Sequence, residues 1–314
     1  MIEILSTGLP NTVQDSGRPG FLDAGVSLGG AMDRPALGAA NALLGNAPDA
    51  AAIEVALFPF RLRFHEDTGF AVCGAWGNAM LDGEPLPPWW AGAGRAGQEL
   101  RLDPPARGAR AVVAFSGGID VPPVLGSRAT DAKGGFGGLE GRGLKRGDRL
   151  GLLQAPKGRT RAWGVAPGWL HEDWNVLRVV GAAETDAFTQ ASREAFFGAE
   201  WRVGASANRQ GYGLEGPRLE RSSPLELFSH GIVPGTVQVP ASGAPVVQLA
   251  DANTCGGYPK IATVIEADLW KLAQAGTGTG LRFREVSRAD GIAALRAMHA
   301  EIEALRAEVA LARR

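Results

Sequence analysis

Cysteine and histidine are scarce in this sequence. Its 314 residues include two cysteines, Cys73 and Cys255, and four histidines. Neither cysteine belongs to a C-x-x-C motif, and no two histidines are spaced as paired metal ligands, so we expect neither a disulfide framework nor a metal site. Cys73 lies in an apolar stretch and is typical of a small buried strand residue. Each histidine is interpreted as a surface or structural residue.

Long apolar runs and an excess of charge of one sign are also missing. No run reaches the roughly 18 apolar residues of a membrane-spanning helix, and Glu3 stands where a signal peptide carries cations. The 32 Lys and Arg nearly balance the 33 Asp and Glu, for a net charge of −1. Such a chain has no overall field to hold a nucleic-acid backbone or an anionic membrane. We therefore expect a cytoplasmic protein without nucleic-acid or membrane partners.

Several motifs of catalysis and cofactor attachment are absent as well. The sequence has no P-loop of the form G-x-x-x-x-G-K-[ST], no H-E-x-x-H, and no Met-Lys-Met of the kind that carries biotin. The glycine-rich run 134–143 does not fit the dinucleotide motif G-x-G-x-x-G. A self-sufficient kinase or metalloprotease is therefore not expected.

Glycine, in contrast, is abundant: its 45 residues are about twice the average usage. Without low-complexity repeats, so much glycine indicates many tight turns between short elements, which favours a mainly β fold with few helices. Helices are predicted over residues 35–44, 185–197 and 267–275, and residues 155–174 as a linker or cross-domain connection. Strands are predicted at residues 2–5, 61–64, 70–73, 99–102, 111–115, 149–153, 175–180, 201–203, 236–239, 246–249, 261–265 and 281–286.

The C-terminal residues 289–314 have a helical period. Ile292, Leu295, Ile302 and Val309 fall on one stripe, which predicts an amphipathic helix. This helix either docks on its own domain or associates with a partner or a second copy.

Three polar stretches are candidates for a functional site. Residues 12–20 form a turn rich in hydrogen-bonding groups, which is also typical of a surface loop in which Asp15 bonds its own backbone. Residues 29–34 bring glycines and the pair Asp33-Arg34 to a helix N-terminus, a position that favours anions. A purely structural role for Asp33 as the helix cap would explain part of this pattern, but it would not explain Arg34.

The third stretch, residues 251–260, reads Asp-Ala-Asn-Thr-Cys-Gly-Gly-Tyr-Pro-Lys. Gly256 and Gly257 allow the backbone to approach a ligand closely, and Lys260 offers a point charge suited to phosphate or carboxylate. Lys260 is also one of only five lysines in the chain. The alternative interpretation is a plain tight turn.

These stretches resemble the signature of the family of 5-oxoprolinase C subunits, also described as KipA, allophanate hydrolase subunit 2 or the biotin-dependent carboxyltransferase family. The resemblance covers about residues 3–287, in order. The matching segments are residues 12–15 and 17–20, 30–34, 40–41, 44–46, 53–54, 231–235, 237–240 and 256–262. It implies two tandem cyclophilin-like β-barrels, over residues 1–160 and 161–287, followed by a C-terminal helix over residues 288–314.

The resemblance also implies an activity, partners and site residues. It implies work with a homologous, KipI-like B subunit and a ring-opening A subunit, using ATP with magnesium to activate the lactam carbonyl of 5-oxoproline or another small polar amide. Such a step needs cations and hydrogen-bond donors. The candidate catalytic residues are Asp33, Arg34, Arg209 and Lys260. The candidate substrate-binding residues are Gln14, Asp15, Arg18, Glu54, Glu215, Asp251, Gly256, Gly257 and Tyr258.

Two other functions stay open. The first is a carboxyltransferase that uses N-carboxybiotin on urea or a related small amide, with biotin on a separate carrier. The second is a non-catalytic module that binds a KipI-like protein. Asn208, Gln210 and Gly213 depart from the family's usual residues around Arg209, and so do Asn253 and Cys255 before the paired glycines. These departures affect groups that would face the substrate.

Overall fold

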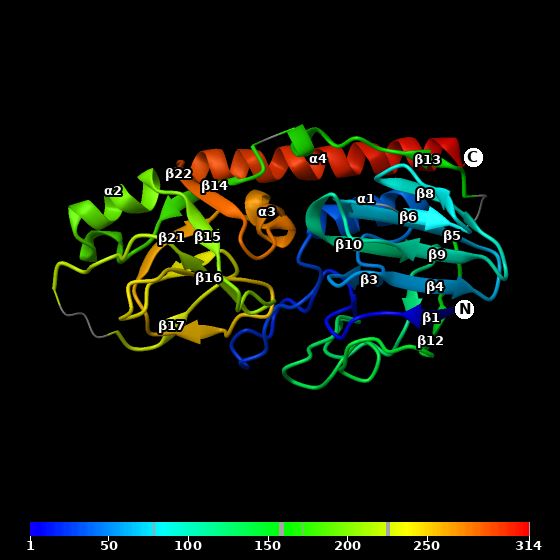
Figure 1. The fold of residues 1–314 in the computed structure, drawn as a ribbon, viewed down its shortest axis with the longest axis horizontal. Helices are drawn as coiled ribbons and strands as arrows, with labels where there is room; N and C mark the ends of the chain where they lie inside the picture. Colours follow the sequence, from blue (N-terminus) through cyan, green and yellow to red (C-terminus); the bar gives the residue numbers. More distant parts are fainter. Residues whose placement is uncertain (78, 157–159, 172, 224–226, 314) are drawn as a thin grey trace. The chain divides into compact units, whose positions relative to one another are not determined.

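In the computed structural model, the described residues are 1–314 except 78, 157–159, 172, 224–226 and 314. They form two compact units. The first unit contains residues 1–18, 29–168 and 299–314, and the second contains residues 19–28 and 169–298. Figure 1 labels the elements along the chain.

The first unit is built from two antiparallel sheets. The seven-stranded sheet has the order β11 (Ile119–Asp120), β12 (Arg149–Leu152), β1 (Ile2–Ser6), β4 (Phe60–Phe64), β9 (Glu99–Leu102), β6 (Ala79–Leu81) and β7 (Glu84–Pro85). The six-stranded sheet has the order β13 (Trp163–Gly164), β8 (Trp90–Gly94), β5 (Thr68–Trp76), β10 (Arg107–Phe115), β3 (Ala52–Val55) and β2 (Thr12–Gln14).

The core of the first unit contains apolar residues from both sheets. Strand β4 shows the alternation expected of a half-buried strand, because Leu62 and Phe64 are buried and Arg63 is exposed. The ring centroid of Phe64 lies 5.5 Å from that of Phe70 in β5 and 6.3 Å from that of Phe115 in β10. Burying each such side chain stabilises the fold by about 1.5–3 kcal/mol.

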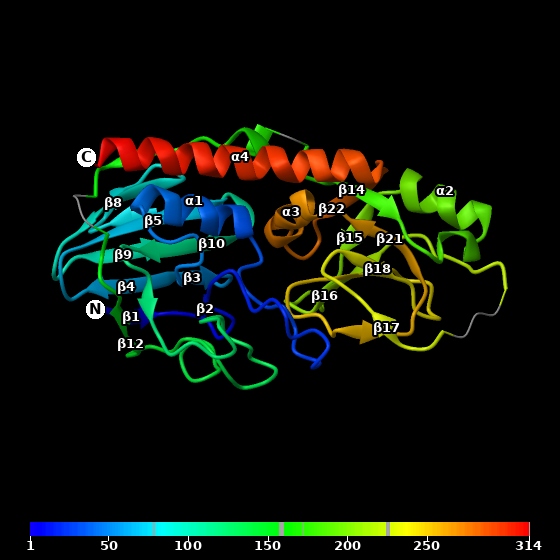
Figure 2. The ribbon, with the colours of Figure 1, turned by 180° about the vertical axis from the view of Figure 1, so that it is seen from behind.

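Helix α1 (Arg34–Leu44) packs on β5 and β10, as Figure 2 shows from behind. It ends at Gly45, whose φ of 67° is left-handed and whose N–H bonds back to Ala42. The part of α4 (Arg288–Ala312) that belongs to the first unit docks beside it. Arg306 donates to the carbonyl of Asn46 at 2.6 Å, and Arg313, directly after the helix, donates to that of Leu44 at 2.7 Å. The C-terminal helix therefore docks on its own chain.

The second unit contains a closed barrel. Its strand order is β14 (Val176–Gly181), β21 (Lys260–Val264), β18 (Thr236–Gln238), β19 (Val246–Gln248), β16 (Gly211–Glu215), β15 (Trp201–Val203) and β22 (Gly280–Glu285). The parallel pairing of β14 with β22 closes the ring, and the other pairs are antiparallel. A separate two-stranded sheet joins β17 (His230–Gly231) to β20 (Cys255–Gly256).

Short helices complete the second unit. These are η1 (Gly168–His171), of which residues 169–171 belong to this unit, η2 (Thr185–Ala187), α2 (Gln190–Gly198), η3 (Glu266–Asp268) and α3 (Leu269–Gln274). The Oγ1 atom of Thr189 caps α2 by accepting from the N–H of Ser192 at 3.2 Å. The ring of Phe196 in α2 stacks on Phe283 of β22, with 4.3 Å between centroids, which fixes α2 on the barrel.

The mainly β class, with a barrel and a C-terminal helix, confirms the prediction from the sequence. One local expectation was wrong: the helix predicted over residues 185–197 is divided, because Thr189 starts a new helix after η2. The stretch 155–174, predicted as a linker or cross-domain connection, contains the boundary between the two units after residue 168, and it also contributes β13, which pairs with β8. Among the described residues, no helix has the length and apolarity needed to cross a membrane.

Candidate functional site

Two of the three polar stretches meet in the first unit. The carbonyl of Asp15 accepts a hydrogen bond from the N–H of Ala31 at 2.8 Å. At Gly30, where φ is 82°, an added Cβ would lie 2.6 Å from the backbone nitrogen of Gly17. Only glycine allows this backbone approach. The sequence motif at residues 29–34 therefore has a structural reason for its glycine, independent of any ligand.

The carboxylate of Asp15 is buried and engaged on both oxygens. Its Oδ1 atom accepts from the N–H of Gly17 at 2.8 Å and from Oγ of Ser127 at 2.7 Å, and its Oδ2 atom accepts from the N–H of Arg128 at 2.5 Å. Asp15 thus joins its own turn to a loop more than 110 residues later in the chain. Hydrogen-bond partners of this kind are typical of a residue that fixes loops.

Gln14 and Arg18 are buried on either side of this turn. Gln14 donates through Nε2 to the carbonyl of Thr130 at 3.2 Å, and no described group hydrogen-bonds its Oε1 atom. The guanidinium of Arg18 donates to the carbonyl of Ala129 and lies 4.9 Å from the ring centroid of Phe136. Both side chains hold residues 129–136 in place.

Asp33 and Glu54 both act on the start of α1. Asp33 is the N-cap, and its Oδ1 atom accepts from the N–H of Ala36 at 2.9 Å. Glu54 in β3 is buried and accepts from the N–H of Met32 at 2.7 Å, while Arg110 of β10 lies 3.7 Å from its other oxygen. Arg34 is the first residue of α1 and is half-buried. The predicted residues of the first unit therefore gather around the N-terminus of one helix.

A second polar cluster lies in the second unit around Lys260, which begins β21. The side chain is buried, with an exposed fraction of 7%, and its Nζ atom hydrogen-bonds Nε2 of His230. Its backbone N–H donates to Oε2 of Glu184 at 3.1 Å. Burial lowers the pKa of the Lys260 ammonium, and the nearby Glu184 carboxylate partly opposes that effect. Lys260 is thus less readily charged than an exposed lysine.

Two glutamine side chains adjoin this cluster. Gln238 of β18 is the register partner of Lys260 and is buried. Its Oε1 atom accepts from Nε2 of Gln248 at 3.1 Å, and its own Nε2 donates to the carbonyl of Tyr258 at 3.5 Å. A Cβ added to Gly256 would lie 2.6 Å from Nε2 of Gln238, so this glycine makes room for the carboxamide.

The predicted residues near Lys260 differ in their surroundings. The side chain of Tyr258 is 54% exposed. Gly257 lies close to the carbonyl of Leu227, which a Cβ would approach to 3.0 Å. Glu215 is exposed at the end of β16, in register with Arg202.

Arg209 and Asp251 were predicted as a cation and an acceptor for the substrate, and the structure pairs them with each other. Nε and Nη2 of Arg209 donate to Oδ2 and Oδ1 of Asp251 at 2.8 and 3.0 Å. The backbone N–H of Asp251 also donates to the carbonyl of Arg209 at 2.9 Å. The pair closes the loop between β19 and β20 onto the turn before β16.

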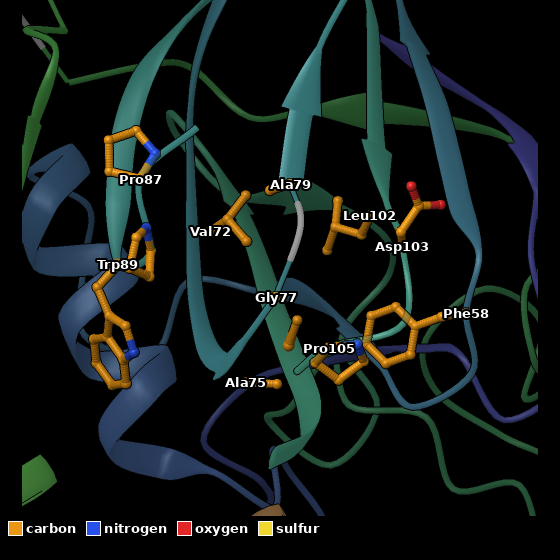
Figure 3. Close-up of a pocket in the computed structure, with 12 residues that line it drawn as sticks. Phe58, Val72, Ala75, Gly77, Ala79, Pro87, Trp89, Leu102, Asp103 and Pro105 are labelled. Carbon is orange, nitrogen blue, oxygen red and sulfur yellow. The ribbon is translucent and has the colours of Figure 1, made fainter. Parts of the chain in front are cut away.

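A different feature, a shallow apolar pocket, lies in the first unit (Figure 3). Its wall includes Phe58, Val72, Trp89, Leu102 and Pro105, with Asp103 as its charged member. None of the predicted site residues lines it. A polar amide would find few partners there, so the polar clusters are the better candidates.

Sequence reasoning missed His230, Glu184 and Gln238. His230 directly precedes the segment 231–235 and Gln238 lies within the segment 237–240, both of which carry the family resemblance. That proximity was the available signal for these two. Glu184 carries no such signal, because its contact with Lys260 spans 76 residues of sequence.

The chain is similar to known proteins over most of its length. The profile of the carboxyltransferase domain, subdomain A and B, matches residues 24–285. The chain is 43% identical over 295 residues to the 5-oxoprolinase C subunit of Escherichia coli K12, covering 94% of both chains. It is 42% identical over 287 residues to the Haemophilus influenzae protein of the same name, covering 91% of this chain and 92% of that one.

A solved structure extends the likeness to the fold. The crystal structure of the K. lactis urea carboxylase superposes with a TM-score of 0.90 at 29% identity. The match covers 97% of this chain and 29% of the urea carboxylase chain. The present chain thus spans less than a third of that larger protein.

Proposed function

Because the chain belongs to the family of carboxyltransferase domains with subdomains A and B, as its resemblance predicted, we propose that it is the C subunit of a 5-oxoprolinase-type complex. In this complex it binds 5-oxoproline or a related small amide and helps to activate the amide carbonyl for hydrolysis. The partners are a KipI-like B subunit and a ring-opening A subunit. The observation that carries the proposal is the 43% identity to a 5-oxoprolinase C subunit over 94% of both chains.

The cluster around Lys260 suits an amide substrate. A lactam presents one carbonyl acceptor and one N–H donor, and a carboxamide side chain can match both. Gln238 and Gln248 bring two carboxamides beside a buried amine. An amide is a poor electrophile, so phosphorylation of its oxygen by ATP would create a leaving group for ring opening.

Magnesium-bound ATP enters this proposal at the level of the complex. Within the part of the chain that the structure describes, no group of three or more His, Cys, Asp or Glu side chains could hold a metal ion. The role that we propose for this chain is to bind the amide and to handle its proton.

The test is reconstitution. The chain is purified, combined with its B and A partner subunits, and assayed for ATP-dependent release of glutamate from 5-oxoproline. We expect turnover only in the complete set, and a loss of at least about 100-fold with Lys260→Met, as for removal of a general base. Lys145→Met, at an exposed lysine, is the matched control. An inactive set, beside an active set containing the E. coli C subunit, would contradict the proposal.

A second candidate function is carboxyl transfer from N-carboxybiotin to urea or another small amide. The superposition on the K. lactis urea carboxylase over 97% of this chain favours it. A biotinylated carrier protein would then be required. Carboxylation of a small amide that depends on such a carrier, with no glutamate release, would support this function. Binding to the KipI-like partner without any turnover would instead indicate a non-catalytic module.

A further inference from the structure

Three ionisable side chains meet in the second unit. Lys260 opens β21, His230 lies in β17 of the small sheet, and Glu184 directly precedes η2. Nζ of Lys260 contacts Nε2 of His230, and Oε1 of Glu184 lies 3.6 Å from the same Nε2. The other oxygen of Glu184 accepts from the backbone N–H of Lys260 at 3.1 Å, so the carboxylate is held beside both bases.

The backbone determines which nitrogen of His230 carries a hydrogen. Nδ1 lies 2.9 Å from the carbonyl oxygen of Phe228, and a carbonyl oxygen only accepts. Nδ1 is therefore protonated, and in the neutral ring Nε2 presents its lone pair to Nζ of Lys260. If the ring gains a second proton, the nearby Glu184 carboxylate stabilises the imidazolium.

The contact between Lys260 and His230 limits the charge of the pair. Two cations at hydrogen-bond distance repel each other, so the contact disfavours the state in which both bases carry a positive charge. The two bases differ in their access to solvent. Lys260 is 7% exposed, whereas the side chain of His230 is 42% exposed. The side chain in register with Lys260 on β18 is Gln238, which is uncharged. A proton that reaches His230 can leave to water.

From this geometry we infer that Lys260 is the general base for the substrate amide and that His230 relays the proton to solvent. The inference rests on the proposed function. The amide N–H proton moves to the unprotonated Nζ, the N–H bonding pair forms a C=N bond, and the carbonyl π electrons move to oxygen. That oxygen would then be the nucleophile toward the γ-phosphorus of ATP bound in the complex, with ADP as the leaving group. Lys260 passes a proton to Nε2 of His230, and the imidazolium releases a proton to water.

The first test does not depend on a measurement of enzyme activity. In the full chain labelled isotopically at the lysine ε-carbon, five lysine signals are followed by NMR as pH changes, and Lys260→Arg identifies the signal of Lys260. We expect the Lys260 midpoint to lie below that of an exposed lysine, because burial lowers this pKa. His230→Ala should shift the Lys260 signal, because Nζ then loses its contact with Nε2. Glu184→Gln should lower the Lys260 midpoint further, because the Glu184 charge raises this pKa. A Lys260 signal that follows Lys145 overturns the inference.

The second test uses the reconstituted complex. We expect His230→Ala to lower kcat by about 100-fold with little change in KM, as for loss of one proton-transfer group. Added imidazole should restore part of kcat, since the ring of His230 is partly exposed. His299→Ala, at an exposed histidine of α4, is the control. Full activity of His230→Ala, or a loss that imidazole does not restore in a normally folded variant, would refute the relay.

The two tests separate the two proposals. If the wild-type set shows no amide turnover but Lys260 titrates below the exposed lysines and its signal responds to His230→Ala, the proposed function fails and the contact between the two bases stands. If the wild-type set is active but Lys260 titrates as an exposed lysine, the function stands and the relay fails.

Discussion

Arg209 and Asp251 form a two-pronged ion pair, with Nε and Nη2 of the arginine 2.8 and 3.0 Å from the two carboxylate oxygens. The residues are 42 positions apart, and their side chains are largely buried, at 14% and 11% exposure. Each side chain therefore supplies hydrogen-bond partners for the other before any ligand is present. Their first role in the free protein is to close a loop.

Removing this pair should lower stability. Arg209→Met should reduce the free energy of unfolding by about 2 kcal/mol, because it strips the hydrogen bonds from a partly buried carboxylate. Arg209→Lys should recover little, since an ammonium cannot reproduce the two-pronged geometry. Urea unfolding measures the effect, with Arg202→Met at an exposed arginine as control. Unchanged stability with weaker substrate binding would instead support the ligand-binding role predicted from the sequence.

Asp33 should show a helix-capping effect. Asp33→Ala should lower the free energy of unfolding by about 1 kcal/mol. Asp33→Asn can still accept from the N–H of Ala36, so it should keep most of the stability that the cap contributes. Thermal and urea unfolding of the two variants test this. The catalytic role predicted for Asp33 would be supported by a different pattern, in which Asp33→Asn unfolds like the wild type but abolishes turnover.

Gly256 and Gly231 offer a matched pair of substitutions. They lie on the adjoining strands β20 and β17, but a Cβ at Gly256 would lie 2.6 Å from Nε2 of Gln238, whereas nothing lies within 4 Å of a Cβ at Gly231. Gly256→Ala should therefore displace the Gln238 carboxamide and destabilise the protein by about 0.5–1.5 kcal/mol, as for the loss of one side-chain hydrogen bond. Gly231→Ala should change stability by less than about 0.5 kcal/mol. Equal unfolding midpoints for the two variants would contradict this packing account.

The two cysteines should differ sharply in reactivity. Cys73 is buried, and burial, with the charge of Asp33 as a second cause, raises the pKa of its thiol well above the ordinary value. Cys255 is exposed. A thiol reagent at mildly alkaline pH should label Cys255 alone in the native protein and both after unfolding. In Cys255→Ser the native protein should not react, and rapid labelling of Cys73 would show that this part of the core opens easily.

Cys73 also gives a pH dependence of stability. Its folded-state pKa is raised, so above the unfolded pKa of about 8.5 the unfolded thiol ionises and the folded one does not. Stability should consequently fall as pH rises beyond that value. Cys73→Ala should remove this part of the decline, which urea unfolding at several alkaline pH values would measure.

Local sequence patterns predicted much of the fold. Strand β4 follows from the alternation of Leu62 and Phe64 with arginines, and α1 follows from Asp33 before it and Gly45 after it. Strands β8 and β16 were not predicted, because their glycines lower the β propensity that a sequence window detects. These strands exist because neighbouring strands supply their hydrogen bonds.

The sequence by itself determined the mainly β class and the family, and it predicted a site in the stretch ending at Lys260. Those features are carried by neighbouring residues, which a linear pattern can express. The tertiary structure alone decided that His230 and Glu184, 30 and 76 positions away, surround that lysine, and that Arg209 is matched to Asp251. Such pairings depend on which strands become neighbours when the barrel closes, and that depends on the packing of the whole unit.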